Sequence, residues 1–390
     1  MKILFVTLCS LETNTSVTKS NLGILTGLNE LGHDVTIVMP ELDGSVNYYD
    51  NSFVLDNYRI IRFKSGGIGN KIASLNSSPS KFKQYILRIF RRLYQKFSIF
   101  DRTKEFLNCT SELPIYDTCF DVVISTSDPK TSHLFVERMR ENGLKYNKWI
   151  QHWGDPLSGD ISSVLIYPQS YIKIVEKNII KNADKVVYVS PFTVEVQKRN
   201  YPDFIEKIHF VPLACDQPTT KQFSVTNTET KGILTAVYLG DYSSHIRDIM
   251  PLYNAVSKMK NIKLTIAGGT DLVLSNTDNI TILPRVKQDK VKELESKASV
   301  IISIGNLSGT QIPGKLYYAA SSQKIILVTV DGDNKEDMIK YLDSFNRFVI
   351  CNNTENSITE ALEQISTNRV KSFSIPERLL PKNVAKDILS

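Results

Sequence analysis

The feature that most constrains this chain is a repeated alternation of short apolar runs with amphipathic segments. Six apolar runs predict strands, at residues 2–7, 34–39, 120–125, 148–152, 185–190 and 208–212. Helical spacing lies between the first two, at 20–31, and Gly32 follows it, where a glycine commonly ends a helix. The runs lack strict two-residue alternation, which is typical of parallel strands buried on both faces.

The alternation breaks once and then restarts. Residues 212–231 are rich in Thr, Ser, Gln and Asn without periodicity, so they predict a linker. After the break, strands are expected at 233–240, 262–268, 280–284, 300–305, 324–330 and 347–351. Helices are expected between them, at 251–259, 291–298, 315–321 and 336–342.

Two such series predict an α/β chain with two Rossmann-like domains facing each other across a cleft. The chain has 390 residues, more than one hydrophobic core usually supports. The expected division is an N-terminal domain at 1–212, a linker at 213–232, a C-terminal domain at 233–372, and a segment at 373–390 that can return to the first domain.

Composition excludes several classes of protein. With 42% hydrophobic and 23% charged residues, the chain is neither disordered nor fibrous. No apolar run approaches the ~18 residues of a membrane span, and the first residues are expected to form a buried strand, not a signal peptide. Five scattered cysteines without a CxxC pair fit a reducing cytoplasm and predict neither disulfides nor zinc. We expect no metal and no nucleic-acid partner, because no matching signature occurs.

The order of motifs resembles that of GT-B fold glycosyltransferases of the family 4 type, which build bacterial surface polysaccharides. Seven stretches over most of the chain carry the resemblance: MKILFVT (1–7), LGHDVTIV (31–38), ADKVVYVS (183–190), KIHFVPLACD (207–216), VYLG (237–240), LTIAG (264–268) and IPGKLYYAA (312–320). The resemblance implies transfer of a sugar from a UDP- or GDP-linked donor to a lipid-linked or oligosaccharide acceptor, as in capsule or O-antigen synthesis. It also implies retention of anomeric configuration without a metal or other cofactor.

The chain departs from this family at several positions. Two glutamates eight residues apart are usual, the later one on the nucleotide ribose, but Thr310 and Tyr318 occupy these positions. Asp241 stands where an arginine is common. Two alternatives therefore stay open: a non-catalytic glycosyltransferase-like subunit that binds glycan, and a nucleotide-sugar epimerase on the same fold.

Donor-side residues are expected in loops that follow strands of the second domain, where ligands of such sheets bind. Lys315 can place a cation beside the diphosphate, and Arg247 can supply a second one. Glycines after strands let a ligand approach the backbone, although tight turns explain them equally well. The full candidate set is Gly240, Arg247, Gly268, Gly269, Thr310, Gln311, Gly314, Lys315 and Tyr318. Asp331 and Asp333 spell a DxD sequence, which we interpret as a turn.

Catalytic candidates gather in the first domain at KWIQHWGDP (148–156), where His152 and Asp155 fall at a strand end. An imidazole there can contact the reacting sugar, and a carboxylate can hold or deprotonate an acceptor hydroxyl. The alternative is a packed histidine followed by an Asp-Pro turn. Acceptor-side candidates follow two other strands, at Asn14, Thr15, Ser127 and Asp128.

A basic amphipathic segment predicts a membrane contact. Residues 51–104 hold twelve of the 47 Lys and Arg residues and only two acidic ones. Within them, 81–100 has aromatic and aliphatic residues at helical spacing opposite basic ones, represented by Phe82, Arg88, Arg91 and Arg92. This pattern suits an anionic lipid surface, such as the inner face of the plasma membrane, although a core-facing helix has the same spacing.

Overall fold

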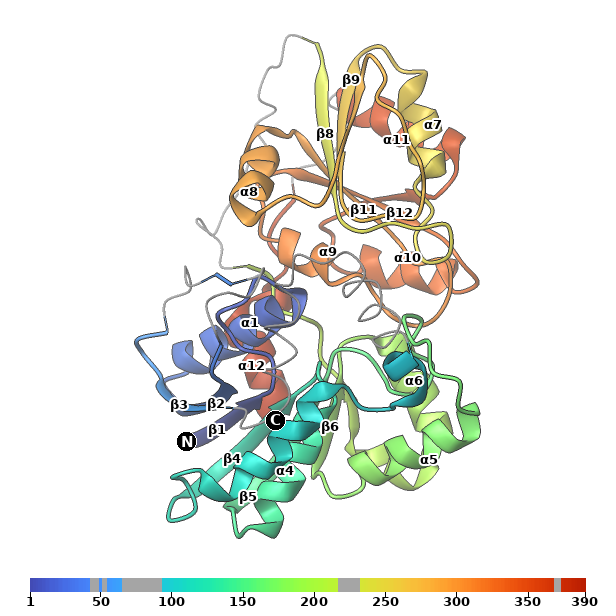
Figure 1. Cartoon of the computed structure of the whole chain (residues 1–390). Helices are drawn as coiled ribbons and strands as arrows, with labels where there is room; N and C mark the ends of the chain where they lie inside the picture. The colour runs from blue at the N-terminus through green and yellow to red at the C-terminus, as the bar shows by residue number, and fades with distance from the viewer. Residues whose placement is uncertain (43–48, 51–54, 65–92, 217–231, 368–372) are drawn as a thin grey trace, which may run out of the picture. The chain divides into compact units, whose positions relative to one another are not determined.

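The chain forms two compact α/β units. The computed structural model describes residues 1–42, 49–50, 55–64, 93–216, 232–367 and 373–390 (Figure 1). Unit 1 comprises Met1–Pro212 and Val384–Ser390, and unit 2 comprises Leu213–Asn383. Each unit contains one sheet of parallel strands with helices packed against it, so the expected α/β class is confirmed.

Unit 1 is built on a seven-stranded sheet with the order β3-β2-β1-β4-β5-β6-β7. Its strands are β1 (Lys2–Thr7), β2 (Asp34–Pro40), β3 (Arg59–Phe63), β4 (Cys119–Thr126), β5 (Lys145–Trp153), β6 (Lys185–Tyr188) and β7 (Ile208–Phe210). The order reverses between β1 and β4, which pair in parallel from Ile3 with Val122 to Thr7 with Thr126. Such a reversal opens a crevice at the carboxyl ends of the two strands.

Helices of unit 1 connect these strands. They are α1 (Ser16–Glu30), α4 (Thr131–Glu141), α5 (Gln169–Ile180), α6 (Pro191–Asn200) and the 3-10 helices η1 (Arg102–Glu112) and η2 (Pro202–Lys207). Helix α1 begins four residues earlier than the apolar spacing suggests, because the Thr15 hydroxyl caps it by accepting from Thr18 N at 3.1 Å. Gly32 has φ +75° directly after the helix, as expected of its terminating glycine.

The C-terminal helix α12 (Pro381–Leu389) is tied to unit 1 by two lysines. Lys185 is buried on β6, and its ammonium donates to the carbonyls of Asp387 at 2.9 Å and Ile388 at 3.1 Å. Lys148 on β5 donates to the carbonyl of Leu389 at 3.4 Å. Cations at the last carbonyls of a helix also stabilise its dipole.

Unit 2 is built on a six-stranded sheet with the order β10-β9-β8-β11-β12-β13. Its strands are β8 (Leu234–Leu239), β9 (Ile262–Ala267), β10 (Ile280–Leu283), β11 (Val300–Ile304), β12 (Ile325–Val330) and β13 (Val349–Asn352). Its helices are α7 (Met250–Ser257), α8 (Gln288–Lys297), α9 (Gly314–Ala319), α10 (Lys335–Asp343), α11 (Glu355–Ser366) and the 3-10 helix η3 (Glu377–Leu379). Here the strand order reverses between β8 and β11.

The cores explain why the strand runs are continuously apolar. Every residue of β6, β11 and β12 is buried, which is how parallel strands covered on both faces behave. In unit 1, Trp149, Trp153 and Phe135 join one large apolar cluster. In unit 2, the matching cluster packs Leu252, Ile266 and Leu362 together.

The expected basic helix is only partly within the described residues. Residues 93–97 are helical, whereas Phe82, Arg88, Arg91 and Arg92 lie outside the described part of the chain. Among the helices that the structure describes, none combines the length and apolar character needed to cross a membrane.

Candidate functional site

Two strand ends meet closely at the carboxyl edge of the unit 2 sheet. A Cβ atom on Gly268, after β9, would lie 1.9 Å from the carbonyl oxygen of Gly240, after β8. No side chain fits at that distance, so Gly268 is required by the approach of two backbones. Gly269 donates its N–H to Asp241 Oδ1 at 2.7 Å. These glycines therefore allow the ends of β8 and β9 to approach each other, whether or not a ligand binds there.

Asp241 is held by a cation from a neighbouring strand. Arg285, two residues after β10, donates to its carboxylate and forms an ion pair with it. Burial alone would raise the pKa of Asp241, but the Gly269 N–H and the Arg285 guanidinium outweigh it and lower that pKa. Asp241, after β8, is thus paired with an arginine from the loop after β10.

Lys315 lies over this edge. Its ammonium donates to the Leu239 carbonyl at the end of β8, and a Cβ on Gly240 would lie 3.4 Å from Lys315 Nζ. Lys315 itself is exposed, as the second residue of α9. The predicted donor-side residues Gly240, Gly268, Gly269 and Lys315 therefore come together at one place.

Arg247 joins the same edge through a side chain that the sequence did not suggest. Its Nε donates to Asn306 Oδ1 at 2.9 Å, and its Nη1 donates to the Asp241 carbonyl at 3.4 Å. Asn306 also donates to the Gln311 carbonyl at 2.9 Å, which fixes the loop after β11. Asn306 and Arg285 each stand two residues after a strand, so a search for polar residues at strand ends would have found both.

The remaining donor-side candidates occupy the loop before α9 and the helix itself. Gln311 is buried and Thr310 is half-buried in that loop. Tyr318 is also buried, at 6% exposure, and a Cβ on Gly314 would lie 3.4 Å from its hydroxyl oxygen. The Tyr318 ring is therefore buried and packs against Gly314.

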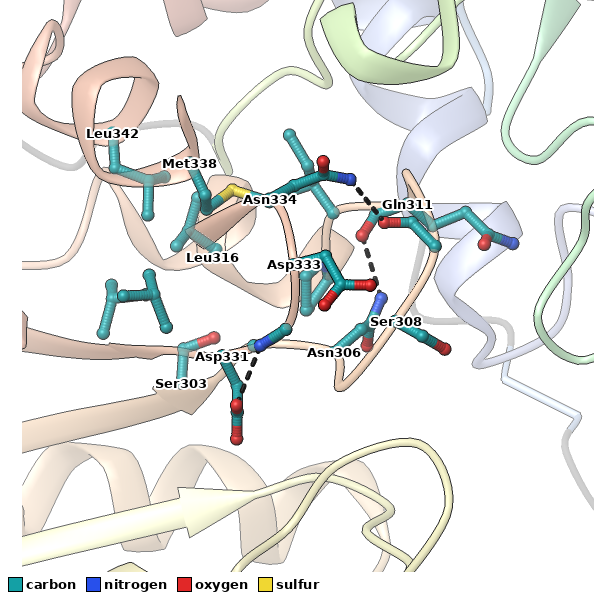
Figure 2. Close-up of a pocket in the computed structure, with 17 residues that line it drawn as sticks. Ser303, Asn306, Ser308, Gln311, Leu316, Asp331, Asp333, Asn334, Met338 and Leu342 are labelled. Atoms are coloured by element: carbon teal, nitrogen blue, oxygen red, sulfur yellow. Dashed lines mark hydrogen bonds between the residues drawn. The ribbon is translucent and has the colours of Figure 1, made fainter. Parts of the chain in front are cut away.

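A pocket opens between the loop after β11 and the loop after β12. Figure 2 shows Leu316, Met338 and Leu342 on one side and Asn306, Ser308 and Gln311 on the other. Its empty volume is about 490 Å³, including space open to solvent. Asp331 and Asp333 also line it, and Gly332 between them has φ +77° and donates its N–H to Asp331 Oδ1. The DxD sequence is thus a turn at the pocket wall.

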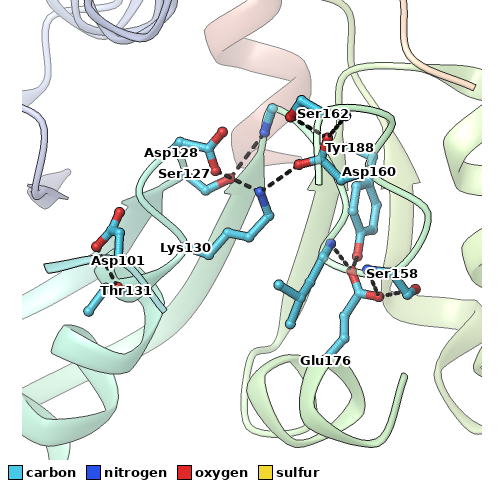
Figure 3. A network of polar contacts seen from close by, with 12 residues as sticks. Asp101, Ser127, Asp128, Lys130, Thr131, Ser158, Asp160, Ser162, Glu176 and Tyr188 are labelled. Carbon is cyan, nitrogen blue, oxygen red and sulfur yellow. Dashed lines mark hydrogen bonds and ion pairs between the residues drawn. The ribbon is translucent and has the colours of Figure 1, made fainter. Parts of the chain in front are cut away.

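In unit 1, a lysine lies between two carboxylates at the carboxyl edge of the sheet. Lys130 Nζ, after β4, donates to Asp128 Oδ1 at 2.9 Å and to Asp160 Oδ2 at 3.4 Å (Figure 3). Burial would lower the pKa of Lys130, but the carboxylates of Asp128 and Asp160 outweigh it and raise that pKa. Asp155 is close enough to contribute to the same effect. Two predicted residues, Asp128 and Asp155, therefore gather around a lysine that sequence reasoning missed.

The other acceptor-side candidates have structural contacts. The Ser127 hydroxyl accepts from Gly154 N at 3.2 Å and so links the loops after β4 and β5. Thr15 caps α1, and Asn14 precedes it in the loop after β1. The Leu8 N–H donates to Ser132 Oγ at 3.1 Å, which ties the start of that loop to α4.

His152 lies in the interior of unit 1. It is 1% exposed, and neither ring nitrogen has a hydrogen-bond partner among the described residues. Burial lowers its pKa to about 4, so the ring is neutral near pH 7. His133 is buried nearby, stacked on Trp153 with ring centroids 4.4 Å apart and bonded to Ser125 Oγ at 2.8 Å. The His152 ring is therefore buried, whereas Asp155 is half-buried.

A buried glutamate holds the loop that carries Asp155 and Asp160. Glu176 on α5 is 0% exposed, and its carboxylate accepts from Leu157 N at 2.7 Å and Ser158 N at 3.0 Å. Tyr201 donates its hydroxyl to the same carboxylate at 2.8 Å. Figure 3 shows this second contact network beside the first. Because its partners lie 18 to 25 residues away, sequence alone gave no signal for it.

The described residues contain no group of three or more His, Cys, Asp or Glu side chains that could hold a metal ion. The three aspartates near Lys130 do not form such a group.

Comparison with known proteins identifies the fold. No family model and no curated protein sequence matches the chain. Among solved structures, the lipopolysaccharide outer core galactosyltransferase WaaB has a TM-score of 0.56 at 13% identity, covering 100% of this chain and 99% of that one. Sucrose-phosphate synthase from Thermosynechococcus elongatus has a TM-score of 0.54 at 14% identity, covering 100% and 94%. HepE of Anabaena, in complex with UDP-glucose, has a TM-score of 0.53 at 9% identity, with the same coverage.

These likenesses extend over the whole chain and include both units. The chain therefore has the GT-B fold of these solved glycosyltransferases.

Proposed function

We propose that this protein is a glycosyltransferase that moves a sugar from a UDP- or GDP-linked donor to a lipid-linked glycan during bacterial surface polysaccharide synthesis. One observation carries the proposal. The side chains of Lys315, Arg247 and Arg285 lie near the glycines that follow β8 and β9, beside the point where the strand order of the unit 2 sheet reverses. Cations beside an accessible backbone suit the diphosphate of a nucleotide sugar. WaaB acts as a galactosyltransferase on lipopolysaccharide outer core, and HepE was solved with UDP-glucose, which supports this choice of substrates.

In the proposed reaction, an acceptor hydroxyl oxygen forms a bond to the anomeric carbon of the donor sugar. The bond from that carbon to the diphosphate breaks, and its electron pair leaves with the phosphate oxygen. Lys315 and its neighbouring cations stabilise the charge that develops there, so no metal ion is needed. The acceptor proton leaves through a base, and we assign retention of configuration on the family resemblance.

Unit 1 supplies the acceptor side of the proposal. Asp155 and Asp128 can accept hydrogen bonds from sugar hydroxyls. Asp128 is paired with Lys130 at 2.9 Å. The Glu176 contacts hold the loop after β5 in one conformation. We assign His152 no direct contact with the sugar, because its ring is buried.

We further propose that the protein works in the cytoplasm at the inner face of the plasma membrane, where a lipid-linked acceptor is presented. The basic segment around Arg88, Arg91 and Arg92 motivates this location, although it lies outside the described residues.

A single series of assays separates the proposal from its alternatives. Purified protein is titrated with UDP, GDP and their sugars, and the binding nucleotide sugars are then incubated with and without glycan acceptors. A glycosyltransferase binds the nucleotide and transfers sugar only when an acceptor is present. Interconversion of nucleotide sugars without acceptor would identify an epimerase, and the absence of nucleotide binding and turnover would identify a glycan-binding subunit.

Asp155 tests the acceptor side directly. We expect Asp155→Asn to lower turnover by about 100-fold, as removal of a positioned acid–base group does. Nucleotide affinity should stay within twofold, since the donor groups lie in unit 2. Asp203→Asn, at an exposed aspartate of unit 1, is the matched control. Equal turnover in both variants would remove Asp155 from the reaction.

A further inference from the structure

Exposed apolar side chains gather on one part of unit 1. Twelve large apolar side chains are exposed among the described residues, and seven of them fall on two short segments. They are Leu93, Tyr94 and Phe97 on the helical turn 93–97, and Val164, Ile166, Tyr171 and Ile174 on the loop before α5 and its first turns. A soluble surface rarely concentrates such residues without a partner.

The two segments form one surface because their backbones are joined. Ile166 donates its N–H to the Lys96 carbonyl at 3.2 Å, and Tyr167 donates its hydroxyl to the Phe97 carbonyl at 2.8 Å. The rings of Tyr167 and Tyr171 lie 5.4 Å apart, which extends the contact to α5. We call this surface the apolar face.

The apolar face is anchored in the core and is not a frayed loop. Leu165 and Tyr167 pack against the main cluster of unit 1, while Val164 and Ile166 between them are 54% and 55% exposed. On α5, Ile172 is buried, whereas Tyr171 and Ile174 are 46% and 59% exposed. The alternation shows that one set of side chains packs into the core and the other is exposed to solvent.

The charges around the apolar face are positive. Lys96 and Lys173 are exposed on the same two segments, and residues 161–175 contain no acidic residue. The flanking carboxylates are engaged within unit 1. Asp160 accepts from Lys130, Glu176 is buried among N–H and hydroxyl donors, and Asp203 pairs with Lys177 at 2.6 Å.

We propose that the apolar face docks on an anionic lipid bilayer, with its aliphatic residues and Phe97 at the acyl boundary and its lysines on lipid phosphates. Aliphatic and aromatic residues rimmed by lysines are the composition that binds such an interface, with tyrosine suited to the headgroup level. The inference rests on the proposed function, because a lipid-linked acceptor would reach the enzyme from this bilayer. It adds a docking surface on α5 and the preceding loop, which adjoins residues 93–97 of the predicted basic segment.

The test compares binding of the full chain to vesicles of phosphatidylcholine alone and of phosphatidylcholine with phosphatidylglycerol. We expect the wild type to sediment with the anionic vesicles and to release at high salt. Ile166→Asp with Ile174→Asp should weaken this binding about 25- to 100-fold, since each half-exposed isoleucine contributes about fivefold to tenfold. Lys96→Glu with Lys173→Glu should weaken it by about 25-fold or more, and mainly at low salt.

Controls keep this proposal separate from the proposed function. Val273→Asp changes a 97% exposed valine of unit 2 and should alter vesicle binding less than twofold. All variants should keep the melting temperature and nucleotide affinity of the wild type. Vesicle binding that is the same in the wild type and the isoleucine variant would overturn the docking surface while leaving nucleotide binding intact. A wild-type dimer in sedimentation velocity that the isoleucine variant abolishes would also overturn it and assign the face to a second copy.

Discussion

Replacing His152 with leucine should change how the stability of the protein depends on pH. The imidazole is 1% exposed without a hydrogen-bond partner among the described residues, and burial lowers its pKa to about 4. In the unfolded chain its pKa is near 6.5. Between these values the unfolded state binds a proton that the folded state does not, so acid favours unfolding.

The magnitude follows from the difference in pKa. A shift from 6.5 to about 4 is equivalent to about 3 kcal/mol. The destabilisation of the folded state by His152 is absent above pH 7 and grows as pH falls towards 4. In His152→Leu it should vanish, so that the variant gains about 1–2 kcal/mol relative to wild type near pH 5. Burial lowers the pKa of His133 and His152 lowers it further, so the variant also loses part of the acid sensitivity that His133 confers.

Urea denaturation of both proteins at pH 8 and pH 5 measures the effect. Parallel loss of stability in wild type and variant would refute the reasoning, because a ring reached by water would keep its ordinary pKa. The same variant addresses the sequence-based hypothesis of catalysis by His152. That hypothesis expects a turnover loss of about 100-fold with an unchanged melting temperature at every pH.

Two further predictions concern buried contacts. Glu176→Ala should destabilise the protein by about 3–5 kcal/mol, because Leu157, Ser158 and Tyr201 all lose a buried acceptor. Glu195→Ala, at an exposed position of α6, should stay within about 0.5 kcal/mol in the same denaturation assay, and equal losses would contradict the role of Glu176. Gly268→Ala should cost more than about 2 kcal/mol and lower nucleotide affinity, because its Cβ would lie 1.9 Å from the Gly240 carbonyl oxygen. A melting temperature within 1 °C of wild type, measured by calorimetry, would show that the two strand ends can separate freely.

The sequence predicted strands best where both faces of a strand are buried. Runs such as 300–305 and 324–330 correspond to β11 and β12, because full burial leaves a continuous apolar signal. It missed β3, Arg59–Phe63, which is an edge strand with arginines at positions 59 and 62. Charged residues on an edge strand prevent unwanted pairing, and they also hide the strand in a hydropathy pattern.

For the candidate site, the sequence identified residues at strand ends but not the side chains that contact them. The glycines and Lys315 were found because they follow strands in unit 2. The Asp241–Arg285 pair joins residues that are 44 positions apart, and the Glu176 carboxylate serves a loop 18 positions away. Burial of His152 follows from side chains packed over β5, which a linear pattern does not contain.

The most direct test of the account is the affinity of the protein for UDP and GDP, measured by titration calorimetry with the wild type and Lys315→Ala. A charge-assisted hydrogen bond contributes about 1.5–3 kcal/mol, so Lys315→Ala should weaken binding of the preferred nucleotide roughly 10- to 100-fold. Lys263→Ala, at an exposed lysine near the opposite end of β9, should change it less than twofold. Absence of binding to the wild type, or equal affinity in all three proteins, would contradict the assignment of unit 2 as the donor site.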